Sequence, residues 1–144
     1  MADNVYISTD KEKVDLRFVH QYLSEEAYWS KGIPFETLKR SVENSLNFSL
    51  FLDSKQVAYA RVITDYATIA YLGDVFVSPP HRGRGFSKLL MEYITAFPCL
   101  VGLRRWILIT GDAHGLYEQF GWKLLDQPAK WMEINNKNPY PLTQ

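Results

Sequence analysis

Short apolar runs separated by polar turns occupy the middle of the chain, a pattern typical of β-strands. Five runs of this kind predict strands over residues 5–8, 46–52, 56–63, 68–77 and 105–110. Two further segments, 122–125 and 130–134, alternate between apolar and polar side chains and predict a closing hairpin. The run at 105–110 is apolar throughout its middle, so we expect it to be buried on both faces of a sheet.

Apolar residues at helical spacing predict four helices, each with recognisable start signals. Thr9 or Asp10 is placed to cap the first helix, Pro34 to begin the second and Asp112 to cap the last. The helices are expected around residues 14–23, 34–45, 85–97 and 113–120.

Two kinds of connection between the strands indicate the fold class. Tight turns after residues 52 and 64 imply antiparallel pairing. The strand at 68–77, the helix at 85–97 and the strand at 105–110 imply a parallel pair. We therefore expect an α/β fold with a mixed, mostly antiparallel twisted sheet of about six to seven strands and helices on both faces. No linker or repeat divides the chain, so residues 1–144 are expected to form a single domain.

A glycine-rich turn, HRGRGFS, lies between that strand and helix and follows two prolines that end the strand. Such a turn presents unpaired backbone amides at the positive end of the helix dipole, which suits phosphate oxygens. Arg82 and Arg84 add positive charge, and Gly83 and Gly85 let the backbone approach a ligand closely. The spacing differs from the dinucleotide and nucleoside-triphosphate motifs. From these residues alone, the turn is either an anion site or a surface turn with two solvated arginines.

Composition excludes several classes of function. The formal net charge is 0, which disfavours a dedicated nucleic-acid-binding protein. No apolar run approaches the roughly 20 residues of a membrane span, so no membrane partner is expected. The chain has 1 cysteine and 3 histidines that lack metal-ligand spacing, so no metal is expected. A polar N-terminus and hydrophobic content of 47% favour a cytoplasmic globular protein.

Two blocks of residues resemble one known family. Arg82 to Ser87, followed by a pair of leucines, resembles the pyrophosphate-binding R-x-x-G-x-G/A motif of the GNAT N-acetyltransferases. The block LYEQFGW at residues 116–122 is similar to the L-Y-E-x-x-G-F segment of the same family. The resemblance covers about residues 45–126, with Ser87 in place of the usual Gly or Ala. It implies that the two parallel strands splay apart and that acetyl-CoA enters the gap between them.

The resemblance also implies roles for individual residues. The backbone of the strand end pairs with the pantetheine arm, and the loop amides hold the pyrophosphate. Tyr117 matches the tyrosine of the second block and is implied as the general acid for the departing thiolate. The implied cofactor-binding residues are Val75, Phe76, Val77, Arg82, Gly83, Arg84, Gly85, Phe86 and Ser87. Tyr28 and Trp29 lie between two predicted helices, where they either line the acceptor pocket or pack in the core.

The general base is less clear, because the predicted strand at 105–110 lacks the glutamate that some relatives carry there. Asp74 flanks the strand end beside a glycine and is the preferred candidate. Other candidates stay open, namely Asp112, His114, Asp65, Tyr66 and a chain of water molecules.

The expected activity is therefore transfer of an acetyl group from acetyl-CoA to a primary amine of a small molecule, peptide or protein, by direct attack in a ternary complex. An acyl-CoA-binding sensor or catalytically silent module is the main alternative, and a structural domain that binds adventitious anions is a weaker one. Exposed aromatic residues such as Trp131 suggest a homodimer.

Overall fold

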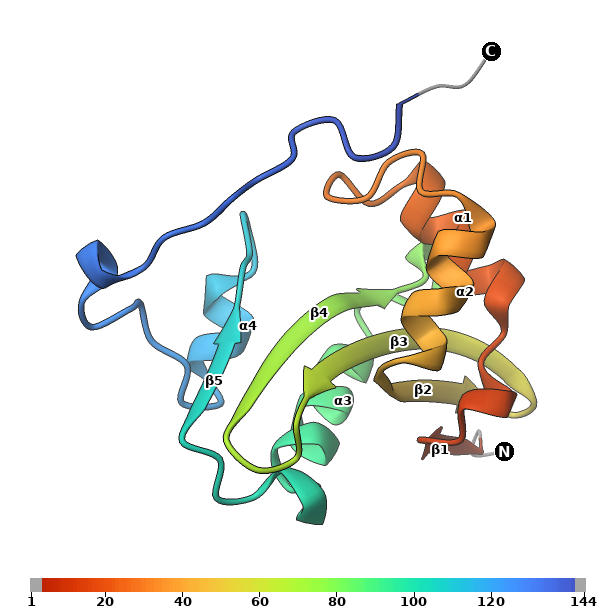
Figure 1. The fold of residues 1–144 in the computed structure, drawn as a ribbon. Helices are drawn as coiled ribbons and strands as arrows, with labels where there is room; N and C mark the ends of the chain where they lie inside the picture. Colours follow the sequence, from red (N-terminus) through yellow and green to blue (C-terminus); the bar gives the residue numbers. More distant parts are fainter. Residues whose placement is uncertain (1–3, 142–144) are drawn as a thin grey trace.

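One mixed sheet forms the centre of the molecule, as the computed structural model, which describes residues 4–141, shows in Figure 1. The strands follow one another across the sheet in chain order, and the first four pair antiparallel. The last two pair parallel, which confirms the expected mixed, mostly antiparallel sheet. The strands are β1 (Val5–Ser8), β2 (Leu46–Leu52), β3 (Lys55–Thr64), β4 (Ile69–Val77) and β5 (Arg105–Leu108).

Helices cover both faces of this sheet, as expected. They are α1 (Leu16–Glu25), α2 (Phe35–Glu43), α3 (Phe86–Thr95) and α4 (His114–Glu118). The first two helices pack on one face around Tyr59 and Phe76, while α3 packs on the other face over Ala58 and Ala60. Successive side chains of β3 thus point to opposite faces, as the pleat of a strand requires.

The first helix begins later than predicted, because Asp10 caps a short 3-10 turn and Asp15 caps the helix itself. The side chain of Asp10 accepts a hydrogen bond from the Glu12 amide at 2.9 Å, but it starts only a short 3-10 turn, Lys11–Lys13. The side chain of Asp15 accepts from the Phe18 amide at 3.1 Å and caps α1 itself.

The strand count is lower than the predicted six to seven, because the closing hairpin does not form in the described part of the chain. Residues 123–139 are all exposed and run as an extended segment from the side of β5 and α4 towards the loop between α1 and α2 (Figure 1). The prediction that residues 105–110 are buried on both faces is also wrong. β5 is the last strand of the sheet, and Ile109, just beyond it, is 79% exposed.

Two irregularities of the sheet lie at β4. Only residues 69–72 of β4 pair with β5, so the last five residues of β4 have no parallel neighbour. The ladder between β3 and β4 also shifts register opposite Asp74, whose φ is 53°. The bulge expected near Gly73 is therefore present, with the positive φ on the following aspartate.

Candidate functional site

A cleft of about 440 Å³ opens where β4 and β5 separate. Its walls come from the free end of β4, the loop before α3, the start of α4 and the loop after α1. Most of the predicted cofactor-binding and catalytic residues line it, namely Val75, Phe76, Val77, Arg82, Gly83, Gly85, Phe86, Ser87 and Tyr117. Arg84 and Asp74, which were predicted with them, are outside this lining.

The loop before α3 presents backbone amides at one end of the cleft. Gly83 and Gly85 have φ values of 79° and 81°, which a residue with a side chain rarely adopts. α3 has no side-chain cap, and among residues 4–141 the amides of Phe86 and Ser87 have no hydrogen-bond acceptor. A Cβ built on Gly85 would meet no atom within 4 Å, so the space over these amides is open. The loop is therefore able to receive an anion such as a phosphate.

Arg82 forms hydrogen bonds within the protein that hold this loop in place. Its amide donates to the carbonyl oxygen of Pro79 at 3.3 Å, so this amide is not among the open ones. Its guanidinium donates to the carbonyl oxygen of Val77 at 3.2 Å and to the hydroxyl of Tyr22 at 2.8 Å. Arg82 thus ties the end of β4 to α1. The guanidinium of Arg84 lies 5.1 Å from the ring centroid of Phe86.

The free end of β4 turns polar backbone groups towards the cleft. The amide of Ser78 donates to the carbonyl oxygen of Val57 at 2.8 Å, and Phe76 lies opposite Tyr59 in the ladder with β3. Because backbone groups in an antiparallel ladder alternate in direction, those of Val77 point away from β3. The ring of Phe76 is buried and stacks on Tyr22 at 4.0 Å, so this residue meets the cleft mainly through its backbone.

Tyr117 lines the cleft from α4. It is 8% exposed, and no described residue forms a hydrogen bond with its hydroxyl group. Burial, with smaller contributions from Asp112 and Tyr28, raises the pKa of Tyr117 from 10.0 to about 12. Its hydroxyl group therefore stays protonated at neutral pH and has a free hydrogen to donate.

Asp74, the preferred base, has both carboxylate oxygens occupied. One oxygen accepts from Arg61 Nε at 2.8 Å, and the other accepts from Trp29 Nε1 at 2.9 Å. The ion pair is largely buried, with side-chain exposures of 18% for Arg61 and 11% for Asp74. Sequence reasoning missed Arg61, because nothing in the spacing of residues 61 and 74 signals that they meet across a bulge. Asp74 thus holds Trp29 in place beside the cleft.

The other candidate bases fall in different places. Asp112 lines the cleft beside Tyr117, and its carboxylate has no partner among the described side chains. His114 lies outside this cleft and lines a second cavity instead. Asp65 accepts hydrogen bonds from Thr68 and from the amides of the turn that follows, which hold the pKa of its carboxyl well below the usual range. A carboxylate so engaged is a poor base.

The loop between α1 and α2 forms one wall of the cleft. The hydroxyl of Tyr28 accepts a hydrogen bond from the Gly111 amide at 2.9 Å, which bridges this loop to the segment before α4. Trp29 packs edge-on against Tyr28 and is fixed by Asp74. Both residues line the cleft together with Glu26. Neither is core packing, because Tyr28 and Trp29 are exposed.

Comparisons with known proteins agree on the family. The sequence profile of the Acetyltransferase (GNAT) family matches residues 12–122. A crystal structure from Xanthomonas campestris pv. campestris, described as belonging to the GNAT family, is 48% identical in sequence. It has a TM-score of 0.94, and the match covers 96% of this chain and 98% of that chain.

Two further relatives differ more in length or sequence. N-alpha-acetyltransferase 80 of Mus musculus is 34% identical over 83 residues, which are 56% of this chain and 26% of the mouse protein. An acetyltransferase structure with acetyl-CoA from Clostridium acetobutylicum has a TM-score of 0.66 and is 15% identical, covering 93% of this chain and 96% of that chain. At that identity the likeness concerns the fold alone.

Proposed function

Because the chain belongs to the GNAT family of acetyltransferases, we propose that it transfers the acetyl group of acetyl-CoA to a primary amine, by direct attack in a ternary complex. One observation carries the proposal: a single cleft joins the open amides before α3 to the buried hydroxyl of Tyr117. That arrangement matches a substrate with a diphosphate at one end and a reactive group at the other. The acetyl-CoA that accompanies the Clostridium acetobutylicum acetyltransferase supports the choice of co-substrate.

In this proposal the loop and the strand end hold the coenzyme. The open amides of Phe86 and Ser87 bind pyrophosphate oxygens, aided by the dipole of α3. The backbone groups of Val75 and Val77 pair with the amides of the pantetheine arm, as a strand edge pairs with an extended peptide. When bound, acetyl-CoA supplies an activated acetyl group and a thiolate leaving group. Arg82 holds the two binding elements in register.

Tyr117 is proposed as the proton donor to the departing sulfur. Its pKa of about 12 lies roughly three units above that of an ordinary thiol, so complete transfer of its proton is uphill. We therefore assign its contribution to a hydrogen bond that stabilises charge on the sulfur as the bond to carbon breaks. The hydroxyl is free to make this bond, because no described residue occupies it.

Asp112 fits the role of base better than Asp74. The carboxylate of Asp74 accepts hydrogen bonds from two side chains and does not line the cleft. Asp112 lines the cleft beside Tyr117. A base near the acceptor nitrogen removes the proton that the amine must lose before or during attack. We propose that Asp74 positions Trp29 and that Asp112, directly or through one water molecule, accepts this proton.

The acceptor is proposed to be a primary amine of a small molecule, peptide or protein. Glu26, Tyr28 and Trp29 give the acceptor side one carboxylate and two aromatic rings, which attract a protonated amine before it loses its proton. The name of the mouse relative supports an amino group as the acceptor. A single domain, a cytoplasmic location and a homodimeric state belong to the same proposal.

Two measurements test the activity. Calorimetry with acetyl-CoA and with inorganic phosphate distinguishes a coenzyme site from an adventitious anion site, and only the coenzyme is expected to bind tightly. Loss of thioester absorbance with a panel of polyamines, amino acids, aminoglycosides and peptide N-termini then identifies the acceptor class. Tight binding of acetyl-CoA with no acetylation of any amine favours the sensor alternative. Failure to bind acetyl-CoA contradicts both readings.

A further inference from the structure

The charged side chains that line the coenzyme cleft differ in sign from one wall to the next. The basic ones, His81 and Arg82, belong to the segment before α3. The acidic ones, Glu26 and Asp112, come from the end of α1 and from the segment before α4. Transfer to an amine needs one base, and Asp112 is proposed for that role above. The second carboxylate, that of Glu26, is therefore available for another task.

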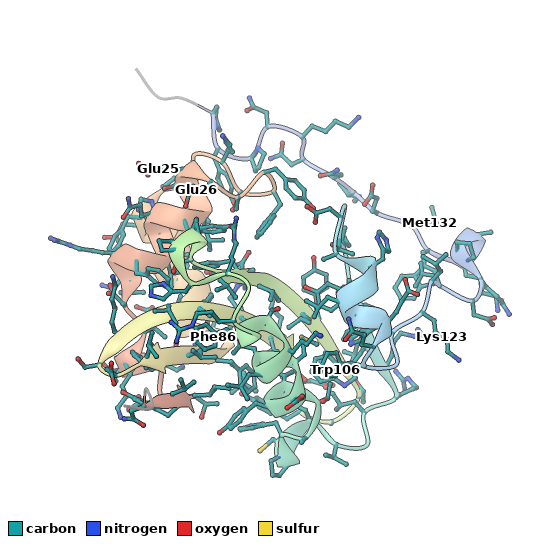
Figure 2. The ribbon with its side chains drawn as sticks, turned by 180° about the vertical axis from the view of Figure 1, so that it is seen from behind. Glu25, Glu26, Phe86, Trp106, Lys123 and Met132 are labelled. Carbon is teal, nitrogen blue, oxygen red and sulfur yellow. The ribbon has the colours of Figure 1, made fainter. Side chains whose placement is uncertain are left out.

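Glu26 lies at a position that is unfavourable for a carboxylate within the fold. It is the C-cap of α1, where the negative end of the helix dipole disfavours negative charge, and the last turn of this helix has no basic residue. Glu25 adds a second negative charge, and Figure 2 shows the two residues together at the end of the helix. Within residues 4–141, no side chain pairs with the carboxylate of Glu26. A local rule that is broken without gain inside the fold is typical of a functional position.

Two aromatic rings on the loop after Glu26 are exposed but fixed. Tyr28 and Trp29 are 61% and 43% exposed, and their rings meet edge to face with centroids 5.1 Å apart. The hydroxyl of Tyr28 accepts a hydrogen bond from the Gly111 amide, and the indole of Trp29 donates to Asp74. Exposed aromatic faces attract an ammonium group through the ring quadrupole, and a nearby carboxylate adds to this attraction. The loop thus offers a preformed place for a cation.

Tyr28 also sets the distance from this place to the reacting end of the cleft. A Cβ built on Gly111 would lie 2.9 Å from the Tyr28 hydroxyl oxygen, so glycine allows this close approach. Asp112 follows Gly111, so Glu26 and Asp112 lie on two segments that one tyrosine side chain joins. Tyr117, which is 8% exposed and has no described partner for its hydroxyl group, lines the same cleft. Besides burial, Asp112 and Tyr28 raise the pKa of Tyr117, as expected for groups that lie near one another.

We propose that Glu26 selects acceptors that carry two positive charges, and that the acceptor is a short aliphatic diamine. This inference rests on the acetyltransferase activity proposed above. One nitrogen reacts beside Asp112 and Tyr117, while the other stays protonated against Glu26 and the ring of Trp29. The electron pair of the reacting nitrogen forms the amide bond, the carbon–sulfur bond breaks, coenzyme A leaves as a thiolate, and Asp112 takes the proton of the nitrogen.

The product of this reaction keeps only one ammonium group. It cannot place that group against Glu26 and also present a second nitrogen to the acetyl group. The reaction should therefore stop after one acetylation of the diamine, which mass spectrometry of the product measures.

The ratio of kcat/KM for putrescine to that for n-butylamine tests the role of Glu26, because these amines share one carbon chain and differ by one ammonium group. We expect a ratio of about 30 in the wild-type protein, as for one hydrogen bond between charged groups. Glu26→Gln should lower the ratio to about 2, because putrescine still offers two equivalent nitrogens once the charge pair is lost. Glu25→Gln is the matched control, since it removes the same charge one residue earlier and outside the cleft lining, and it should keep the wild-type ratio.

Calorimetry separates failure of this inference from failure of the proposed activity. Titration of putrescine and of n-butylamine into the protein with coenzyme A needs no turnover. If no amine is acetylated but putrescine binds more tightly and Glu26→Gln removes this preference, the transferase proposal fails and the role of Glu26 stands. Where n-butylamine and putrescine are acetylated equally well, or where Glu26→Gln keeps the preference of the wild-type protein, the transferase proposal stands and the role of Glu26 is overturned. Equal affinities without any acetylation overturn both.

Discussion

At the scale of single residues, the cleft separates groups that are fixed from groups that are free. Asp74 and Arg82 each hold two partners, so their side chains support the site, although Arg82 also lines the cleft. Tyr117 and Asp112 have no side-chain partner among the described residues and line the same cleft. Chemistry needs groups of the second kind, because a proton donor or acceptor must be able to change its partner during a reaction.

Replacement of Tyr117 by phenylalanine should lower kcat by about 10²-fold and leave the affinity for acetyl-CoA nearly unchanged. In the proposed mechanism the lost hydroxyl group acts on the leaving sulfur, whereas the loop before α3 and the end of β4 hold the coenzyme. In the wild-type enzyme, the pKa of about 12 places the loss of the tyrosine proton above the usual assay range. Activity should therefore show no falling limb caused by Tyr117 up to about pH 10. Stopped-assay rates from pH 6 upwards check both statements, and an unchanged kcat would remove Tyr117 as proton donor.

The two aspartates should respond in opposite ways to conversion into asparagine. Asp112→Asn should lower kcat by about 10²-fold with little effect on thermal stability, because its carboxylate supports no other group. Asp74→Asn should reduce the free energy of unfolding by about 2 kcal/mol, because Arg61 and Trp29 lose a charged acceptor. Steady-state kinetics and thermal unfolding of both variants decide the matter. The reverse pattern would return the role of base to Asp74.

At the scale of elements, the site depends on the C-terminal end of one strand and the N-terminal ends of two helices. β4 outlasts its pairing with β5, α3 begins without a side-chain cap, and α4 begins immediately after the segment bridged by Tyr28. Each of these ends leaves backbone or side-chain groups without a partner among residues 4–141, and all three ends meet at one cleft. The binding capacity that we propose for the cleft therefore comes from incomplete secondary structure.

Gly85→Glu should abolish binding of acetyl-CoA, because it places a carboxylate over the open amides of α3. A side chain at a φ of 81° also costs about 1–2 kcal/mol of stability. Gly102→Glu is the matched control, since Gly102 has a φ of 89° and equally open surroundings but lies in the turn before β5. Calorimetry should find normal affinity in the control and none in the Gly85 variant. Equal affinities would contradict the assignment of the loop.

The elements that the sequence pattern predicted correctly are those whose partners are near in the chain. Glycines and prolines around residues 79–85 predicted the turn into α3, and the apolar runs predicted β2, β3 and β4. The closing hairpin was predicted only from the alternation of apolar and polar residues. Such alternation indicates that a segment can form a strand, but it does not identify the strand with which the segment pairs. The ion pair of Asp74 with Arg61 depends on a bulge between two strands, which no local pattern carries. The cap at Asp15, by contrast, is a local contact with the Phe18 amide.

At the scale of the whole molecule, buried tyrosines link stability to high pH. Burial raises the pKa of Tyr59, Tyr71 and Tyr117 above 10.0, and the hydroxyl of Tyr59 donates a hydrogen bond to the Asn47 side chain. Below pH 10 the tyrosines are protonated in both the folded and the unfolded state, so pH does not change their contribution to stability. Above pH 10 the unfolded chain releases these protons first, so the folded state becomes relatively less stable.

From neutral pH the free energy of unfolding should therefore be level up to about pH 10 and fall between about pH 10 and 12. Tyr117 alone should account for about 2 kcal/mol of this loss. Tyr59→Phe should begin about 1 kcal/mol less stable, because Asn47 loses its donor, yet it should lose less over this interval. Urea unfolding at a series of pH values measures both effects. Parallel curves for the two proteins would show that Tyr59 does not carry the dependence.

The left-handed backbone conformation at Asp74 also limits which residues can replace this aspartate during evolution. A φ of 53° suits glycine, asparagine and aspartate, whereas a β-branched residue there is strained. Of the three tolerated residues, only aspartate brings a negative charge to Arg61. An engineer who borrows this scaffold for another acceptor thus inherits one position in β4 with almost no freedom of choice.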